Sequence, residues 1–174
     1  MTGKYTEALR NRFCELVRRS YVITPNLTEA LILLYGKEKM EAIWREFQEI
    51  SGRERLDQIE ETGRRLAEKF SLSAVVITGV DYREGEELVK IGNLVLEKEK
   101  SSWVFAEKSG GSYSGTGDLF ASVLSAGLVK GYSMKKCAHL AVDFISASIR
   151  DAVEEGTDRN DGVCFEAHLG RLIQ

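Results

Sequence analysis

A loop rich in glycine and serine runs directly into an apolar segment within residues 108–131. The apolar run predicts a helix that begins near Thr116, approached through glycines. The first backbone N–H groups of a helix have no partners within the helix, and that end carries partial positive charge. Gly115, Thr116 and Gly117 would therefore line a pocket suited to an anion.

Asp118 adds a carboxylate to the first turn of this predicted helix. The helix dipole stabilises negative charge there, so we expect the carboxylate to be ionised near neutral pH. Beside an anion pocket, it could accept the proton of a hydroxyl group that attacks a phosphate. The pattern fits a purely structural role equally well, because aspartate is common in first helical turns. The glycine loop is neither a Walker loop nor a dinucleotide-binding glycine motif.

A second group of candidate residues lies upstream, at Asn26 and Glu29. A short β-type run at 21–24 is closed by Pro25, so both residues are expected at a strand end, just before a helix. Ligands gather at such strand ends in open α/β sheets, and amide and carboxylate oxygens could orient water around Mg²⁺. Taken alone, the residue types favour helix capping over metal binding.

The elements that must position these residues are predicted from hydrophobic periodicity. Helices are expected at 6–20, from residue 30, and at 37–50, 53–70, 116–130, 134–155 and 165–173. Strands are expected at 21–24 and 73–78, followed by short meander strands at 87–92, 93–97 and 103–106. This order predicts an α/β fold of one domain, 1–174, with a helix-covered, mainly parallel sheet and a meander at its edge.

Two helices carry more specific predictions. The helix at 6–20 places Leu9, Phe13, Leu16 and Val17 on one apolar face. The helix at 116–130 is apolar on almost every side, so we expect it to be buried in the core and to hold the anion pocket rigidly.

Composition narrows the class of protein. The chain has 174 residues, 43% of them hydrophobic, and a net charge of −3, which gives no electrostatic reason to expect nucleic acid or membrane partners. No apolar stretch approaches a membrane span, and the first residues lack the core of a signal peptide, so a cytoplasmic location is expected. Three widely spaced cysteines indicate neither disulfides nor a thiolate metal site.

Three short motifs resemble one family in their order along the chain. The run Ser-Gly-Thr-Gly-Asp-Leu-Phe-Ala at 114–121 resembles the signature of ribokinase-like small-molecule kinases, and its Leu-Phe-Ala end is most similar to the pyridoxal kinase branch. The segment 23–30 is similar to the one that carries the family's Asn-x-x-Glu motif, and Val-Ile-Thr-Gly at 76–79 to a strand end that approaches ATP phosphate. The tail at 158–166 is also similar to this group.

The resemblance implies ATP-dependent phosphorylation of the hydroxymethyl group of pyridoxal, pyridoxamine or pyridoxine, a reaction of vitamin B6 salvage. Asp118 would take the hydroxyl proton. The anion hole would consist of the backbone N–H groups of Gly115, Thr116 and Gly117.

The resemblance also implies how ATP and Mg²⁺ are held. Thr78, Gly79 and Glu29 would bind ATP. Asn26 and Glu29 would organise Mg²⁺ through water, while a requirement for a monovalent cation stays open.

Members of this family are considerably longer, and nothing in this chain is similar to their amino-terminal half. The chain therefore resembles the carboxy-terminal portion, with the ATP and catalytic elements but without most groups that grip the vitamin. An incomplete sheet would expose an apolar edge, and a homodimer is expected. Two alternatives stay open: a hydroxymethylpyrimidine kinase, which shares the scaffold, and a non-catalytic ATP-binding fragment.

Overall fold

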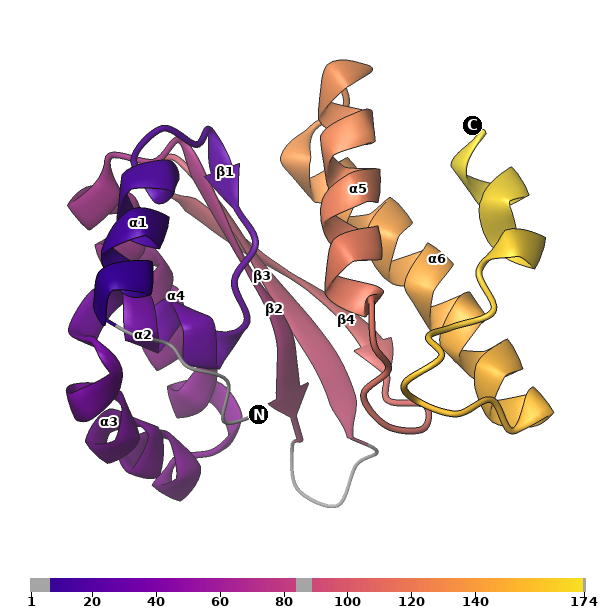
Figure 1. Cartoon of the computed structure of the whole chain (residues 1–174), viewed down its shortest axis with the longest axis horizontal. Coiled ribbons are helices and arrows are strands. Elements are labelled where there is room, and N and C mark those ends of the chain that lie inside the picture. The colour runs from indigo at the N-terminus through magenta and orange to yellow at the C-terminus, as the bar shows by residue number, and fades with distance from the viewer. Residues whose placement is uncertain (1–6, 84–88, 174) are drawn as a thin grey trace. The chain divides into compact units, whose positions relative to one another are not determined.

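A computed structural model describes residues 7–83 and 89–173. The chain divides into two compact units (Figure 1). The first unit consists of Met1–Val80 and Leu96–Ser101, and the second of Asp81–Val95 and Ser102–Gln174.

The first unit is mainly helical. Its elements are α1 (Glu7–Val17), β1 (Val22–Ile23), α2 (Leu27–Tyr35), α3 (Lys37–Glu49) and α4 (Gly52–Phe70). Helix α2 packs against both α3 and α4, as Figure 1 shows. Leu31 of α2, Ile59 and Leu66 of α4, and residues 75–77 of strand β2 (Ala74–Tyr82) are fully buried, so these helices and this strand contribute the core of the unit. The predicted helices at 37–50 and 53–70 are confirmed.

Helix α1 is only partly buried. Cys14 and Val17 are buried, but Leu9, Phe13 and Leu16 are 42%, 41% and 63% exposed. The apolar face predicted for this helix is therefore only partly covered by the described residues. Periodicity identifies an apolar face but does not reveal how much of that face the rest of the chain covers.

The sheet has four strands in the order β1-β2-β3-β4. Strands β2 (Ala74–Tyr82), β3 (Lys90–Glu97) and β4 (Lys100–Glu107) follow one another as a meander, and β3 and β4 are joined by only two residues. Strand β1 pairs in parallel with β2, Val22 opposite Ala74 and Ile23 opposite Val75. The α/β class, with a parallel pair and a meander edge, is thus confirmed.

Residues 87–92 and 93–97 were predicted as separate strands, and this was wrong for the described part. Residues 90–97 form the single strand β3, and 87–88 lie outside the described residues. Gly92 and Asn93, where the two predicted strands met, both have packing roles within β3. A Cβ on Gly92 would lie 2.8 Å from the Phe105 ring, and the buried Asn93 donates a hydrogen bond from Nδ2 to the Val104 carbonyl at 3.4 Å.

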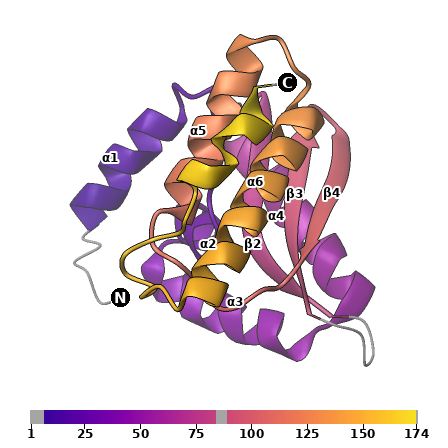
Figure 2. The same ribbon diagram turned by 90° about the vertical axis from the view of Figure 1, so that its right-hand side faces the viewer.

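The second unit contains the two long helices that follow the glycine loop. They are α5 (Thr116–Val129) and α6 (Met134–Glu155), and a 3₁₀-helix, η1 (Glu166–Leu172), follows them. Helix α6 packs against α5 and η1, as Figure 2 shows. It begins at Ser133, whose Oγ accepts a hydrogen bond from Lys136 N–H, and ends at the left-handed Gly156, which confirms both predicted ends.

Helix α5 begins where the sequence predicts, but it is not buried on all sides. Its buried residues form one face: Phe120, Val123, Leu124 and Gly127. Ser122, Ser125 and Ala126 are exposed, and Val129 is 90% exposed. The prediction of a fully buried helix was wrong because small residues, which fit either environment, were counted with the apolar ones. Along the described ranges, no helix is both long and apolar enough to cross a membrane.

Candidate functional site

The predicted site residues fall into two groups, one in each unit. Asn26, Glu29, Thr78 and Gly79 belong to the first unit. Gly115, Thr116, Gly117 and Asp118 belong to the second.

The second-unit group forms the start of α5. Gly115 is the N-cap residue with φ 80° and ψ −8°, a left-handed conformation, and its carbonyl accepts the first hydrogen bond of the helix, from Leu119 N–H at 3.0 Å. Among the residues that the structure describes, none accepts a hydrogen bond from the N–H groups of Thr116, Gly117 or Asp118. These donors are available to an anion at the positive end of the helix dipole.

The space around these amides is open. An added Cβ at Gly115 or Gly117 would meet no atom within 4 Å. Asp118 lies in the first turn of α5 and is exposed, and it makes no hydrogen bond or ion pair with other described residues. The turn thus presents a carboxylate and several free amide donors without filling the space with its own atoms.

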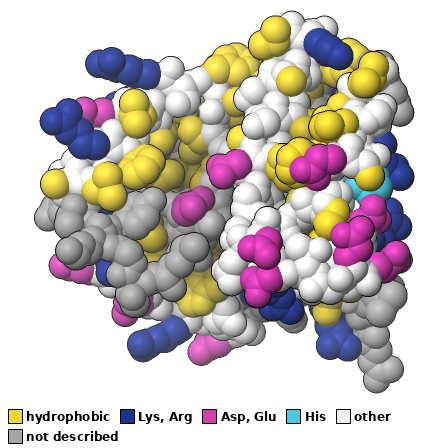
Figure 3. Space-filling model, turned by 45° about the vertical axis from the view of Figure 1, so that its right-hand side comes forward, with side chains coloured by type: hydrophobic (Ala, Val, Ile, Leu, Met, Phe, Trp, Pro, Cys, Tyr) yellow, Lys and Arg dark blue, Asp and Glu magenta, His cyan; other side chains and the backbone are white. Residues whose placement is uncertain are grey.

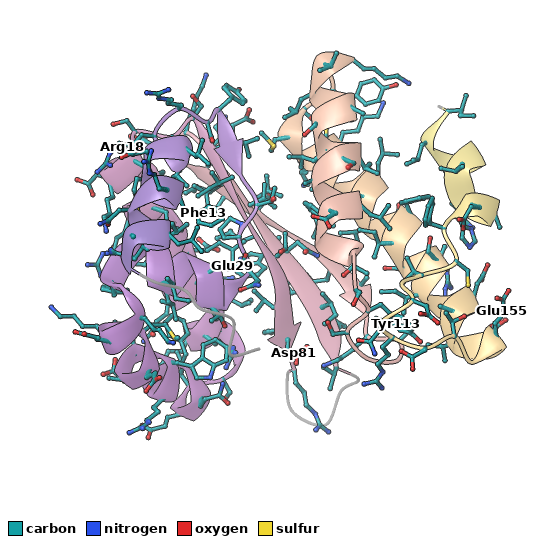
Figure 4. All side chains as sticks on the ribbon, in the orientation of Figure 1. Phe13, Arg18, Glu29, Asp81, Tyr113 and Glu155 are labelled. Carbon is teal, nitrogen blue, oxygen red and sulfur yellow. The ribbon has the colours of Figure 1, made fainter. Side chains whose placement is uncertain are left out.

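The loop before α5 is anchored by Tyr113, which Figure 4 labels. The Tyr113 side chain is buried in a cluster with Ala152 and Val163, and Leu119 packs against the same cluster. The Tyr113 carbonyl accepts a hydrogen bond from the Thr116 hydroxyl at 3.1 Å. The turn that carries the amides is therefore tied to the apolar core of its unit.

The first-unit group lies where the parallel pairing of β1 with β2 ends. Strand β2 itself continues to Tyr82, so the prediction that a strand ends at residues 78–79 was wrong. Thr78 N–H donates to the Pro25 carbonyl at 2.9 Å, and Asn26 and Thr78 form a parallel bridge. Residues 26 and 78 are therefore direct neighbours, as expected for ligand-binding positions at a sheet edge. Gly79, which follows, is exposed with φ 69°, and an added Cβ there would meet no atom within 4 Å.

Asn26 and Glu29 form a complete capping box at the start of α2. Glu29 N–H donates to Asn26 Oδ1 at 2.9 Å, and Asn26 N–H donates to Glu29 Oε2 at 3.0 Å. This is the capping role that the residue types alone favour. Both side chains are exposed, so a carboxylate oxygen and an amide remain accessible from solvent (Glu29 is labelled in Figure 4). The Mg²⁺ role of these residues stays a prediction.

Comparison with known families decides which family the sequence belongs to. The family model of phosphomethylpyrimidine kinase matches residues 2–162. The chain belongs to the phosphomethylpyrimidine kinase family. No match to an individually curated protein was found.

Solved structures similar to this member of the phosphomethylpyrimidine kinase family are kinases or candidate kinases. A candidate phosphomethylpyrimidine kinase from Bacteroides thetaiotaomicron, crystallised with pyridoxal, is 26% identical with a TM-score of 0.79, and the match covers 99% of this chain and 56% of that one. The ADP complex of Bacillus subtilis pyridoxal kinase is 26% identical with a TM-score of 0.61, covering 87% and 51%. Pyridoxal kinase from Lactobacillus plantarum shares the fold at 21% identity, with a TM-score of 0.75 and coverage of 99% and 56%.

The chain spans little more than half the length of these relatives, which accords with the predicted resemblance to part of a ribokinase-like kinase.

The backbone of Gly115 gives a first test of the site of this family member. With φ 80°, alanine at position 115 would be strained, so we expect Gly115→Ala to lower the free energy of unfolding by about 1 to 2 kcal/mol. Gly117→Ala is the matched control, because position 117 is equally open but helical. It should be neutral or stabilising by up to about 1 kcal/mol. Urea denaturation measures the free energy of unfolding of both variants, and equal effects would contradict the left-handed conformation of residue 115.

A separate hollow of about 370 Å³ lies beside the end of α6. Four carboxylates line it: Asp151, Glu155, Asp161 and Glu166. Acidic side chains gather on this face near a histidine, as Figure 3 shows, and Figure 4 labels Glu155. Like charges repel a polyphosphate, so we do not place a nucleotide of this kinase family there.

Cys164 also lines the hollow, and its environment argues against a reactive thiolate. A hydrogen bond with Thr157 favours a lower pKa, but the hydrogen bond from Sγ to Glu155 Oε2 at 3.3 Å acts the other way. The pKa of the Cys164 thiol is raised overall. A protonated thiol is a poor nucleophile, which agrees with the predicted ordinary role of the cysteines.

Two features of the site escaped prediction from the sequence. Tyr113 was expected only as a buried or edge aromatic, with no role in holding the loop, and the loop at 157–163 had no assigned role. Tyr113 holds the glycine loop by packing against Ala152 and Val163, and the loop at 157–163 contacts it through a hydrogen bond from Ser114 N–H to the Arg159 carbonyl at 2.9 Å. The paired glycines at 110 and 111 were the available signal, because adjacent glycines permit close approach of another segment.

Proposed function

We propose that this chain carries the nucleotide and catalytic half of a kinase that phosphorylates a hydroxymethyl group on a small aromatic heterocycle. The observation that carries the proposal is the first turn of α5, where the exposed Asp118 carboxylate stands beside unpaired amide donors in open space. Membership of the phosphomethylpyrimidine kinase family supports phosphoryl transfer, and the ADP complex of the B. subtilis relative supports ATP as the donor.

The chemistry follows from general acid–base and electrostatic catalysis. Asp118 accepts the proton of the acceptor hydroxyl as that oxygen bonds to the γ-phosphorus of ATP. The bond between the γ-phosphorus and the bridging oxygen breaks, and ADP leaves with the electron pair. The N–H groups at the start of α5 donate to the phosphoryl oxygens and stabilise their charge.

The first-unit group would hold the nucleotide and its metal. Thr78 and Gly79 lie within β2, just after its buried residues 74–77, and the open space at Gly79 suits close approach of a phosphate. Asn26 and Glu29 offer hard oxygen atoms, and one carboxylate acting through water fits Mg²⁺, which keeps several waters beside substrate phosphates. The metal would neutralise charge on the phosphates.

The preferred acceptor is pyridoxal, pyridoxamine or pyridoxine. The Leu-Phe-Ala continuation at 119–121 and the pyridoxal in the crystals of the B. thetaiotaomicron relative favour this choice. Hydroxymethylpyrimidine or its phosphate is the second candidate, because the matching family model describes phosphomethylpyrimidine kinases.

Incubating the purified chain with Mg-ATP and each acceptor separately tests the proposal. Formation of a phosphorylated product, followed by mass spectrometry, supports the kinase and identifies the acceptor. A higher melting temperature with ATP but no product would instead favour a nucleotide-binding module without turnover. Neither binding nor product would overturn the proposal.

Glu29→Gln separates the capping and metal roles of this residue. Glutamine at this position also completes a capping box, so the free energy of unfolding should stay within about 0.5 kcal/mol of the original. Loss of the charge should raise the Mg²⁺ concentration for half-maximal ATP binding by about tenfold. Magnesium titrations at fixed ATP measure this effect, and an unchanged midpoint would leave Glu29 with a capping role alone.

A further inference from the structure

The glycine loop before α5 is packed against the loop at 157–163 of the same unit. Ser114 N–H donates to the Arg159 carbonyl at 2.9 Å, and a Cβ on Gly162 would lie 3.5 Å from the Ser114 carbonyl oxygen. Ser114 directly precedes Gly115, the N-cap of α5. The backbone of Arg159 is therefore fixed beside the residue that leads into the amide donors.

The Arg159 side chain lies against the same loop at Gly111. A Cβ on Gly111 would be 2.5 Å from Cζ of Arg159 and 2.7 Å and 2.8 Å from its two terminal nitrogens. Only a residue without a side chain permits this approach without displacing the guanidinium. Position 111 is thus occupied by glycine where the arginine head rests.

The positive charge of Arg159 is not neutralised within the described chain. The residue is exposed, and no described carboxylate forms an ion pair or hydrogen bond with it. Lys108, at the other end of the glycine loop, differs because its Nζ lies 2.9 Å from both carboxylate oxygens of Asp81. An arginine keeps its charge at any physiological pH and presents a fork of donors that matches phosphate oxygens.

We propose that Arg159 is a polyphosphate-binding residue, which adds a side-chain cation to the backbone donors at 115–118. This inference rests on the proposed nucleotide site and deepens it. Amide donors at a helix start act as partial charges, whereas a guanidinium adds a full charge and can make two parallel hydrogen bonds to one phosphate. The hydrogen bond from Ser114 fixes the backbone of Arg159, and the guanidinium itself rests at Gly111 of the loop that leads to these donors.

The test compares ATP with adenosine on the full chain, by calorimetry or by ligand-dependent melting. Arg159→Met should weaken ATP binding about 10- to 100-fold, the effect of losing hydrogen bonds to a charged group. Adenosine binding should not change, because adenosine has no phosphate. Arg159→Lys should recover part of the ATP affinity, and the salt dependence of ATP binding should be weaker in Arg159→Met.

Gly111→Ala provides an independent variant. Its Cβ would push the guanidinium away, and because that group is the flexible end of an exposed side chain, folding should be little affected. The variant should lose ATP affinity as Arg159→Met does, and combining the two should cause no further loss. Arg150→Met is the matched control, since Arg150 is also exposed on this unit and makes no hydrogen bond or ion pair with a described residue of the glycine loop. It should bind ATP like the original chain.

The outcomes separate this inference from the function on which it rests. ATP binding that Arg159→Met leaves unchanged would overturn the inference alone. Equal losses of ATP and adenosine affinity would also overturn it, since they would indicate a structural role. If the original chain binds no ATP, the proposed function fails, and the inference fails with it.

Discussion

Replacing Asp118 with asparagine is expected to reduce the rate of phosphoryl transfer by about 10² to 10⁴-fold. The change keeps the size and exposure of the side chain but removes the carboxylate that we propose as the acceptor of the hydroxyl proton. The unpaired N–H groups of Thr116 and Gly117 remain, so ATP should bind at least as tightly. The loss should therefore appear in kcat rather than in the ATP concentration for half-maximal rate.

The initial rate of acceptor phosphorylation at saturating Mg-ATP measures this effect, with calorimetry for ATP binding. Asp143→Asn is a suitable control, because Asp143 is an exposed aspartate on α6 of the same unit and has no role in the proposed reaction. It should react at the original rate. An Asp118→Asn chain with full activity would show that another group takes the proton.

Local signals predicted the elements that present the site. Helix starts are encoded within a few residues, so Gly115 with Thr116, and Ser133, each marked a helix start that the structure confirms. The helix expected from residue 30 begins earlier, at Leu27, so Glu29 lies in its first turn rather than before it. The β-branched run at 73–78 likewise marked a buried strand. The parallel pairing of β1 with β2 then brings Asn26 next to Thr78.

Long-range packing was not predictable, because it depends on residues far apart in the sequence. Nothing near Gly111 indicates that Arg159 lies on it, and nothing near Tyr113 indicates Ala152 and Val163 as its neighbours. The exposure of Leu16 is a similar case, because helical periodicity shows which residues share a face but not which other segments of the chain cover that face.

The double use of Asn26 and Glu29 shows why a motif alone does not settle a role. The same pair satisfies the capping geometry of α2 and offers exposed oxygen atoms at a strand end. A capping box fixes the Glu29 side chain in one orientation, and a preorganised carboxylate is what a metal-water site requires. The two roles are compatible, so the capping geometry of Asn26 and Glu29 does not exclude the proposed Mg²⁺ role.

Tyr113→Ala is expected to lower the free energy of unfolding of the second unit by about 3 kcal/mol. Tyr113 is only 7% exposed and fills a cluster with Ala152 and Val163, and alanine would leave a cavity there. Urea denaturation followed by Trp103 fluorescence measures the effect, in a Trp44→Phe background so that only the second unit reports. Tyr113→Phe keeps the ring and should stay within about 0.5 kcal/mol of the original, because no described residue bonds its hydroxyl.

The functional effect of Tyr113→Ala should exceed that of a cavity of the same size elsewhere in the unit. The Tyr113 ring holds the loop in place, and the Tyr113 carbonyl accepts a hydrogen bond from the Thr116 hydroxyl. Loss of the ring should therefore loosen the turn that carries the amide donors. Phe144→Ala, in the buried face of α6, is the comparison, since it removes a similar buried volume and Phe144 is not one of the residues in the Tyr113 cluster. At temperatures where both variants are folded, ATP affinity should fall about tenfold more in Tyr113→Ala, because an anion site depends on preorganised donors. Equal ATP affinities in Tyr113→Ala and Phe144→Ala would mean that the turn keeps its conformation without the Tyr113 ring.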